Sequence, residues 1–211
     1  MSDLDQQLIE AAEYGKLDVC IDLLDRGADV NAKNNNGLTP LRSASRNVHS
    51  ASRYGHVDVC ALLLHRGAEV DAKDKDGWTT LHDASFEGNA DVCALLLDCG
   101  ADVNAKNNNG STPLHHASHK DYTDVCALLL DRGANVNAKT RYEDTPLHWA
   151  ADKSRINVCE LLINYGANVN ANGYKGETPL YIATQNKNKD ICKLLINRIK
   201  FVNKKHLLFL I

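Results

Sequence analysis

Apolar and polar positions recur along the chain with a period of about 33 residues. A largely apolar run of the type Asp-Val-Cys-Ala-Leu-Leu-Leu-Asp is followed each time by a polar stretch that resembles Gly-Ala-Asp-Val-Asn-Ala. The run holds a cysteine at a fixed place, and five of these cysteines are evenly spaced: Cys60, Cys93, Cys126, Cys159 and Cys192. A sixth, Cys20, precedes Cys60 at a wider interval. Such a fixed period is typical of stacked repeat proteins.

Each repeat predicts two short helices. Thr112-Pro113 is a helix start, because threonine caps the first turn and proline fits where no N–H partner is needed. Leu114 and Ala117 then fall on one face of the first helix. The apolar positions of 124–130 are spread widely enough for a second helix that is buried on most sides. Gly133 is placed to end this helix in a left-handed conformation, and an extended arm and an Asn-rich turn lead to the next repeat.

The pattern fits six units. A single unit of this length cannot bury its own apolar face, so the units are expected to stack against each other. We therefore expect one domain over residues 1–205, an all-α solenoid of helix-turn-helix units. These units span approximately 1–36, 37–76, 77–109, 110–142, 143–175 and 176–205. The apolar stretch 206–211 lies outside the repeat, where it either seals the end of the core or leads into a longer chain.

The repeat resembles the ankyrin repeat family over about residues 5–203. The resemblance rests on the Thr-Pro-Leu-His runs at 112–115 and 145–148, the Gly-Ala-Asp-Val-Asn-Ala runs at 27–32 and 100–105, and the repeat period. It implies units linked by β-hairpin loops, with inner helices and hairpin tips that line a concave face. It also implies that this face binds a partner protein and that the chain has no enzymatic activity.

Several positions depart from the family pattern. Glu143 replaces the turn glycine of the fifth unit, Thr80 replaces the proline of the third, and Tyr181 replaces the histidine of the sixth. Residues 199–203 look like a decayed Gly-Ala-Asn-Val-Asn. We therefore expect the sixth unit to be a terminal cap with a degraded hairpin.

Composition limits the classes of function. The 211 residues are 24% charged and 44% hydrophobic, which is ordinary for a globular protein. The net charge of −3 and the isoelectric point near 6.3 argue against nucleic acid as a partner. No apolar run approaches the roughly 20 residues that cross a bilayer, and the acidic N-terminus lacks the regions of a signal peptide. We therefore expect no membrane partner.

The repeated cysteines occupy an apolar position of the second helix. Packed helices lie ~8–10 Å apart, whereas a disulfide needs Cα atoms closer than ~7 Å. We therefore expect reduced, buried cysteines and a cytoplasmic location, which would be the host cytosol for a secreted effector. Cys99 stands where other units have arginine, and we expect it to be the most exposed thiol.

No set of residues predicts catalysis or a cofactor. The sequence has no glycine-rich phosphate loop and no nucleophile with a dedicated base. The family implies that His82, His115 and His148 bond locally and fix the loop to the helix. His119 shares a helix face with His115 or His116, but two ligands fall short of a zinc site. We expect no metal, no cofactor and no enzymatic activity.

Three asparagines occupy the Val-Asn-Ala position, at which the family includes targets of asparagine hydroxylation. Asn31, Asn104 and Asn137 are therefore candidate hydroxylation sites. Asparagine also suits turns without any modification, and this structural role explains the same residues.

Positions that vary between units are candidates for partner contact. Aromatic residues are only 6% of the chain, and tyrosine, tryptophan and arginine commonly anchor interfaces. Trp78, Tyr142 and Tyr174 fall at loop tips, and Phe86 and Trp149 on inner helices; for the two tryptophans, packing on a neighbouring element is the alternative. The candidate partner-binding residues are Arg53, Tyr54, Lys75, Trp78, Phe86, His116, His119, Arg141, Tyr142, Trp149, Asp152 and Tyr174.

Residues 43–49 and 50–56 read SASRNVH and SASRYGH, and this near-duplication accounts for the wider interval between Cys20 and Cys60. An insertion of this length is about two helical turns, so it keeps the apolar face in phase. We favour a first helix of the second unit that is two turns longer over a copy that loops out. Arg42, Arg46 and Arg53 would then form a small basic patch.

The sequence thus predicts a monomeric, non-enzymatic protein-interaction module that acts as an intracellular adaptor, inhibitor or effector. Two alternatives stay open. One is a structural or self-assembling scaffold that uses the apolar tail, and the other is the binding part of a longer enzyme.

Overall fold

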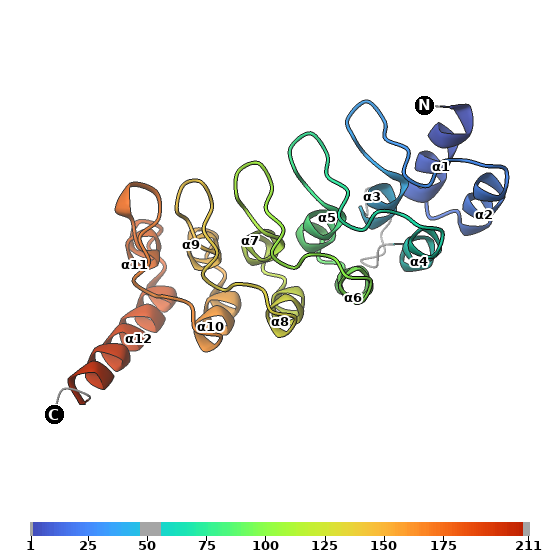
Figure 1. Ribbon diagram of the computed structural model, residues 1–211. Coiled ribbons are helices and arrows are strands. Elements are labelled where there is room, and N and C mark those ends of the chain that lie inside the picture. The colour runs from blue at the N-terminus through green and yellow to red at the C-terminus, as the bar shows by residue number, and fades with distance from the viewer. Residues whose placement is uncertain (1, 47–55, 209–211) are drawn as a thin grey trace. The chain divides into compact units, whose positions relative to one another are not determined.

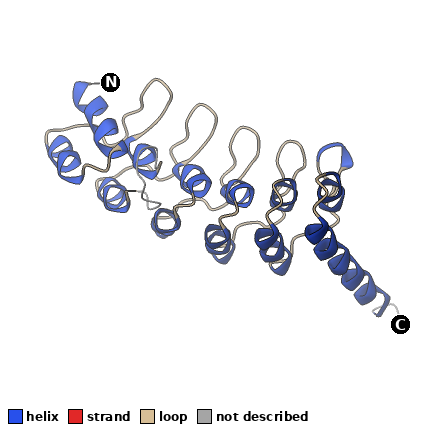
Figure 2. Ribbon diagram, turned by 180° about the vertical axis from the view of Figure 1, so that it is seen from behind, coloured by secondary structure: helices blue, strands red, loops and turns tan. Residues whose placement is uncertain are grey.

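The computed structural model describes residues 2–46 and 56–208, with side chains up to residue 201. The chain divides into two compact halves, Met1–Asn108 and Asn109–Ile211. From here on these halves are called the first and the second unit, and the shorter sequence units are called repeats. All regular structure in the described residues is helical, and no strand occurs there (Figure 2). The expected all-α repeat fold is confirmed. The β-hairpin character of the loops is not, because a loop such as 34–38 is closed by single turn bonds and not by a ladder.

Three helix pairs stack in two rows in the first unit (Figure 1). In the inner row α1 packs against α3 and α3 against α5, and in the outer row α2 packs against α4 and α4 against α6. The bounds are α1 Asp3–Glu13, α2 Leu17–Asp25, α3 Pro40–Ser45, α4 Val57–His65, α5 Thr80–Glu87 and α6 Ala90–Asp98.

The second unit repeats this arrangement. Here α7 packs against α9 and α9 against α11, while α8 packs against α10 and α10 against α12. A single 3-10 turn, η1, lies in the loop before α11. The bounds are α7 Pro113–Lys120, α8 Thr123–Asp131, α9 Pro146–Asp152, α10 Ile156–Asn164, η1 Tyr174–Gly176, α11 Pro179–Gln185 and α12 Lys189–Leu208.

The core of each unit is the layer between the inner and the outer row. The leucine that follows Thr-Pro, such as Leu114 or Leu147, has no exposed surface, and neither have Cys126 and Val158 of the outer row. Full burial of such a side chain contributes about 1.5–3 kcal/mol. Since these positions recur along the repeats, the same small set of contacts stabilises each pair against the next within a unit.

Histidine joins two inner helices of the second unit to the loops that follow them. The Thr112 backbone N–H donates to Nδ1 of His115 at 3.1 Å, so Nδ1 is the acceptor and Nε2 carries the proton. Nε2 then donates to the Asp144 carbonyl oxygen at 3.1 Å. His148 makes the equivalent bonds to Thr145 and Glu177, and burial lowers the pKa of His148. The local structural role that the family implies is confirmed for these two histidines.

The last outer helix does not end where the repeat predicts. We expected a degraded hairpin at 199–203, but α12 continues unbroken to Leu208. The reason lies at one position. Gly166 follows α10 with a φ of 88°, a left-handed conformation suited to glycine, whereas Ile199 stands at the same position one repeat later. Without that glycine the helix has no signal to stop.

The duplicated stretch begins differently from our expectation. Helix α3 ends at Ser45, and Arg46 has an extended backbone with φ −92° and ψ 114°. The favoured interpretation of one helix running on through the insertion is therefore wrong at its start. The remainder of the insertion, 47–55, lies outside the described residues.

The cysteines follow the predicted pattern. All seven are reduced, five of the six repeated cysteines are buried, Cys192 is partly exposed, and Cys99 is the exposed one. Burial raises the pKa of the Cys60, Cys126 and Cys159 thiols to about 12. The buried thiols therefore stay protonated and unreactive at neutral pH.

Thiol labelling of the native protein tests this ladder of cysteines. We expect one fast reaction at Cys99, a slower one at Cys192, and reaction of the other five only after unfolding. Mass spectrometry of the labelled peptides, with and without denaturant, identifies each site. Rapid labelling of Cys60 or Cys126 in the native protein would contradict the burial described above.

One loop position carries backbone strain. Glu143 has a φ of 65°, where the equivalent Gly110 has 76°. A left-handed conformation costs a residue with a side chain roughly 1–2 kcal/mol. We expect Glu143→Gly to raise the free energy of unfolding by about 1 kcal/mol. Urea unfolding measures the change. The control is Glu143→Ala, which removes the exposed ion pair with Lys139 but keeps the strain, and it should give no gain.

Candidate functional site

The aromatic residues of the first unit lie around the loop before α5. Trp78 is half-buried, and its ring lies 6.1 Å from Phe86 in an edge-to-face arrangement and 5.8 Å from His82. Lys75, at the tip of the same loop, is exposed. The packing alternative therefore accounts for part of the Trp78 ring.

A buried ion triad positions this loop. Arg42 of α3 is only 3% exposed, and its Nε donates to Asp83 of α5 at 2.6 Å. Its Nη1 lies 2.9 Å from an Asp74 carboxylate oxygen. The other Asp74 oxygen accepts the Trp78 backbone N–H at 2.8 Å. Arg42 was expected in a surface basic patch, and this expectation is wrong because Asp74 of the loop before α5 and Asp83 of the next repeat enclose the guanidinium.

The pKa values of the triad reflect its burial. Burial raises the pKa of Asp83, against the attraction of Arg42. Asp74 is more open. Burial opposes its ionisation, but the ion pair with Arg42 and the hydrogen bond from the Trp78 backbone N–H lower its pKa. Arg42 therefore holds two carboxylates, one of which fixes the loop that presents Trp78.

The second unit gathers its aromatic side chains on the inner row and the loop tips. Trp149 of α9 is half-buried and reaches α7, where three imidazole rings meet it edge to face. The ring centroids lie 5.2 Å away for His115, 5.5 Å for His116 and 6.1 Å for His119. The predicted residues His116, His119 and Trp149 thus form one cluster.

Charged groups adjoin this cluster. Arg155 donates to the His119 carbonyl oxygen at 3.2 Å, and Asp152 pairs with Lys153 at 2.9 Å. Burial, together with Lys153, Lys120 and Arg155, lowers the pKa of His119. His119 is therefore neutral at physiological pH. Asp152 is also contacted by Asn186, which directly follows α11 and whose side-chain amide donates to the Asp152 backbone oxygen at 2.8 Å.

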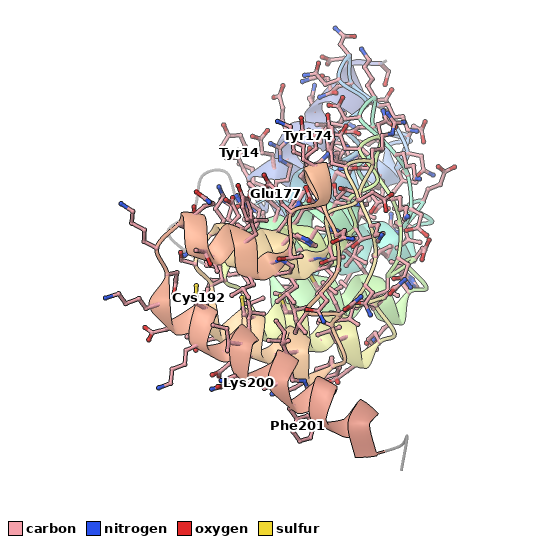
Figure 3. The ribbon with its side chains drawn as sticks, turned by 90° about the vertical axis from the view of Figure 1, so that its left-hand side faces the viewer. Tyr14, Tyr174, Glu177, Cys192, Lys200 and Phe201 are labelled. Atoms are coloured by element: carbon pink, nitrogen blue, oxygen red, sulfur yellow. The ribbon has the colours of Figure 1, made fainter. Side chains whose placement is uncertain are left out.

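Two tyrosines pair at neighbouring loop tips. The rings of Tyr142 and Tyr174 lie 5.7 Å apart at 89°, and they are 59% and 50% exposed. The Tyr174 backbone N–H donates to Asp144, and the Lys175 ammonium lies 5.1 Å from the Tyr174 ring. Figure 3 shows Tyr174 and Glu177 on the loop beside α11. Arg141 is exposed next to this pair.

The remaining predicted residues fall into two groups. Arg53 and Tyr54 lie outside the described residues. The candidate hydroxylation sites Asn31 and Asn137 bridge successive repeats: Asn31 contacts Gly67 and Glu69, and Asn137 contacts Gly166 and Asn168. Asn104 occupies the same position of the repeat sequence as Asn31 and Asn137. This bridging supports the structural role, and hydroxylation stays a hypothesis.

Sequence reasoning missed two contributors to these surfaces. Lys175 adjoins the tyrosine pair, and Arg42 controls the loop of Trp78. The sequence does carry a signal for Arg42, because arginine stands there in the position of the repeated histidine. Across the described residues, no group of three or more His, Cys, Asp or Glu side chains can hold a metal ion, and no helix is long and apolar enough to cross a membrane.

Comparison with known families agrees with the repeat pattern. A model of ankyrin repeats in three copies matches residues 8–107, 48–140 and 139–206. A search of curated proteins finds no match to the chain.

Removal of the triad's cation tests its role in the first unit. Breaking a buried ion pair on one side leaves an uncompensated charge, which costs about 3–5 kcal/mol. We expect Arg42→Met to lower the free energy of unfolding by that amount, measured in urea. The double variant Arg42→Met/Asp83→Leu should recover much of the loss. Equal stability of Arg42→Met and the wild type would contradict the buried triad.

Proposed function

The chain belongs to the ankyrin repeat family, whose repeats are generally protein-protein interaction modules and typically not enzymes, and from this premise we propose that it binds a partner protein through its second unit. The binding surface, which we call the aromatic face, consists of Tyr142 and Tyr174 at the loop tips and Trp149, His116 and His119 on the inner helices. Binding there makes the protein an adaptor, inhibitor or effector within a cell.

The exposed tyrosine pair carries this proposal. Two aromatic rings that are half or more exposed contribute little to the core, yet they are held against each other at an interplanar angle of 89°. Pre-ordered aromatic side chains lose little conformational entropy on binding, and Tyr and Trp are the residues that most often dominate interface energies. The tyrosine pair is therefore the anchor of the aromatic face.

The histidine cluster supports a second contact point. Trp149 is fixed by three rings of α7, so its remaining open surface is held in one orientation. Asp152, Lys153 and Arg155 adjoin it and offer polar contacts of both signs. A rigid apolar centre with a polar rim is the usual anatomy of a protein interface. The first unit, with Trp78, Phe86 and Lys75, offers a second surface of the same kind.

The cysteines support the intracellular setting. None of the seven forms a disulfide, and five of them are buried as part of the repeated core. Reduced cysteines that serve as small apolar side chains suit a reducing compartment.

Alanine substitution of the tyrosine pair tests the aromatic face. A partner is first identified by affinity purification and mass spectrometry, and its dissociation constant for the purified chain is then measured by calorimetry. We expect Tyr142→Ala/Tyr174→Ala to weaken binding by about 30-fold or more, the effect of losing one dominant residue. The free energy of unfolding should change by no more than about 0.5 kcal/mol, because both side chains are exposed.

The matched control is Tyr165→Ala. Tyr165 is 42% exposed at the end of outer helix α10, where its hydroxyl donates to Asp131. We expect this variant to bind the partner normally. Trp149→Phe, which keeps an aromatic ring against α7, should weaken binding without unfolding the unit. Normal binding by the tyrosine double variant would refute the aromatic face as the site.

A further inference from the structure

The last helix pair exposes positions that are buried one repeat earlier. In α11 and α12, Tyr181 is 47% and Ile196 is 40% exposed. The equivalent His148 and Ile163 of the preceding pair are 1% and 3% exposed. Cys192 is partly exposed too, whereas Cys159 is fully buried. We call this surface, Tyr181 with Cys192 and Ile196, the C-terminal end face, and Figure 3 looks onto it.

The opposite side of the repeat is exposed in the first helix pair. Val19 of α2 is 45% exposed, whereas the equivalent Val59 and Val92 of the same unit are 1% and 0% exposed. On α1, Glu10 is exposed at the position where Asp83 of α5 is buried against Arg42. We call this surface, Glu10 with Val19, the N-terminal end face; Asp18 adjoins it next to Val19, at a position that is also exposed in the following repeats.

These two faces are the two halves of one repeated interface. The valine position is exposed only in the first pair, so it is the preceding pair that covers it elsewhere. The repeated cysteine is partly exposed to solvent only in the last pair. In the other pairs it is therefore the following pair that buries this cysteine. Because the outer helices are similar in sequence, a surface shaped like the N-terminal end face is what an outer helix meets on its cysteine side where it packs on the next one in its unit.

The charges of the two ends are opposite. Residues 2–29 hold eight acidic and two basic residues, a net charge of −6; Glu10 is exposed on the end face itself and Asp18 adjoins it. Residues 187–208 hold seven basic and one acidic residue, a net charge of +6. The average over the whole chain, −3, hides this separation. Opposite potentials of this size steer the two surfaces together and disfavour contact between like ends.

A groove lies on the C-terminal end face. It has a volume of about 450 Å³ and is lined by Thr184, Cys192, Ile196 and Asn197 together with the exposed Lys187, Lys189 and Lys193. An apolar patch among lysines fits a surface that has an exposed valine beside carboxylates. Val19 with Asp18 is such a surface.

We propose that copies of this chain associate end to end, the C-terminal end face of one copy binding the N-terminal end face of the next. The contact continues the repeat stacking across two molecules. It is heterologous, so the assembly grows into chains or closes into rings. The interface is separate from the aromatic face, so the proposal goes beyond partner binding. It also replaces the monomer expected from the sequence.

A second copy fits these observations better than a lipid surface does. A basic helix such as α12 also attracts anionic membranes. That alternative explains the lysines. It does not explain why Val19 is exposed at the acidic end, or why the exposed positions of the two ends correspond to the two sides of the contact between successive repeats.

Charge exchange between the ends tests the proposal by sedimentation equilibrium. The wild-type chain should show a mass that rises with concentration and falls as salt is raised from about 0.05 to 0.5 M, because screening weakens the contact. Variant N, Glu10→Lys/Asp18→Lys, makes the acidic end basic. Variant C, Lys189→Glu/Lys193→Glu, makes the basic end acidic. Each alone should associate at least about tenfold more weakly. An equimolar mixture should associate again, because the exchanged ends now match each other.

The matched control carries the same charge change in inner repeats. Asp91→Lys/Asp124→Lys alters the positions equivalent to Asp18 in α6 and α8, both exposed, and should associate like the wild type. Circular dichroism checks that all variants are folded. The tyrosine double variant should also associate normally, which separates failure of this proposal from failure of the aromatic face.

Three results would overturn the proposal. The first is a wild-type chain that stays monomeric at ~1 mM protein and low salt, the range of a weak contact. The second is equal loss of association in the control and in variants N and C. The third is a monomer that binds vesicles of anionic lipid through α12, with variant C abolishing that binding.

Discussion

The structure depends on one constraint, which is that a helix pair of about 33 residues cannot bury its apolar face alone. Each pair therefore presents a leucine of the inner helix and a valine and a cysteine of the outer helix to its neighbours. These positions hardly vary, because a change in one repeat alters the contact with the next. The free energy of folding is thus concentrated in a narrow layer, and the loop tips and the open side of the inner helices are left to vary.

Function follows from this division. Hydrogen bonds from the rings of His115 and His148 to backbone oxygens fix the loops that follow. Side chains on the tips of these loops are therefore held in position without being part of the core. Tyr142 and Tyr174 use that freedom, since they contact each other and remain exposed. Under the same constraint, the first and last pairs expose surfaces whose equivalents elsewhere are buried against a neighbouring pair. An aromatic face and two end faces are consequences of one repeated design.

Much of the fold could be predicted because the repeat determines it. The period predicts the helix pairs, the buried cysteines and the exposed Cys99, and the adjacency of successive loop tips brings Tyr142 and Tyr174 together. Local exceptions were harder. The burial of Arg42 depends on Asp83 of the next repeat, and no local pattern gives that pairing. The continuation of α12 was readable at Ile199, where the terminating glycine is missing, but similarity to the decayed motif favoured a hairpin instead.

The most direct test of the aromatic face is hydrogen exchange of the chain with and without its bound partner, followed by mass spectrometry. Slower exchange on binding should appear in the loops around Tyr142 and Tyr174 and in α9, which carries Trp149. The outer helices α8 and α10 should exchange at the same rate in the free and the bound chain. Protection confined to the outer helices, with the two loops unchanged, would contradict the account.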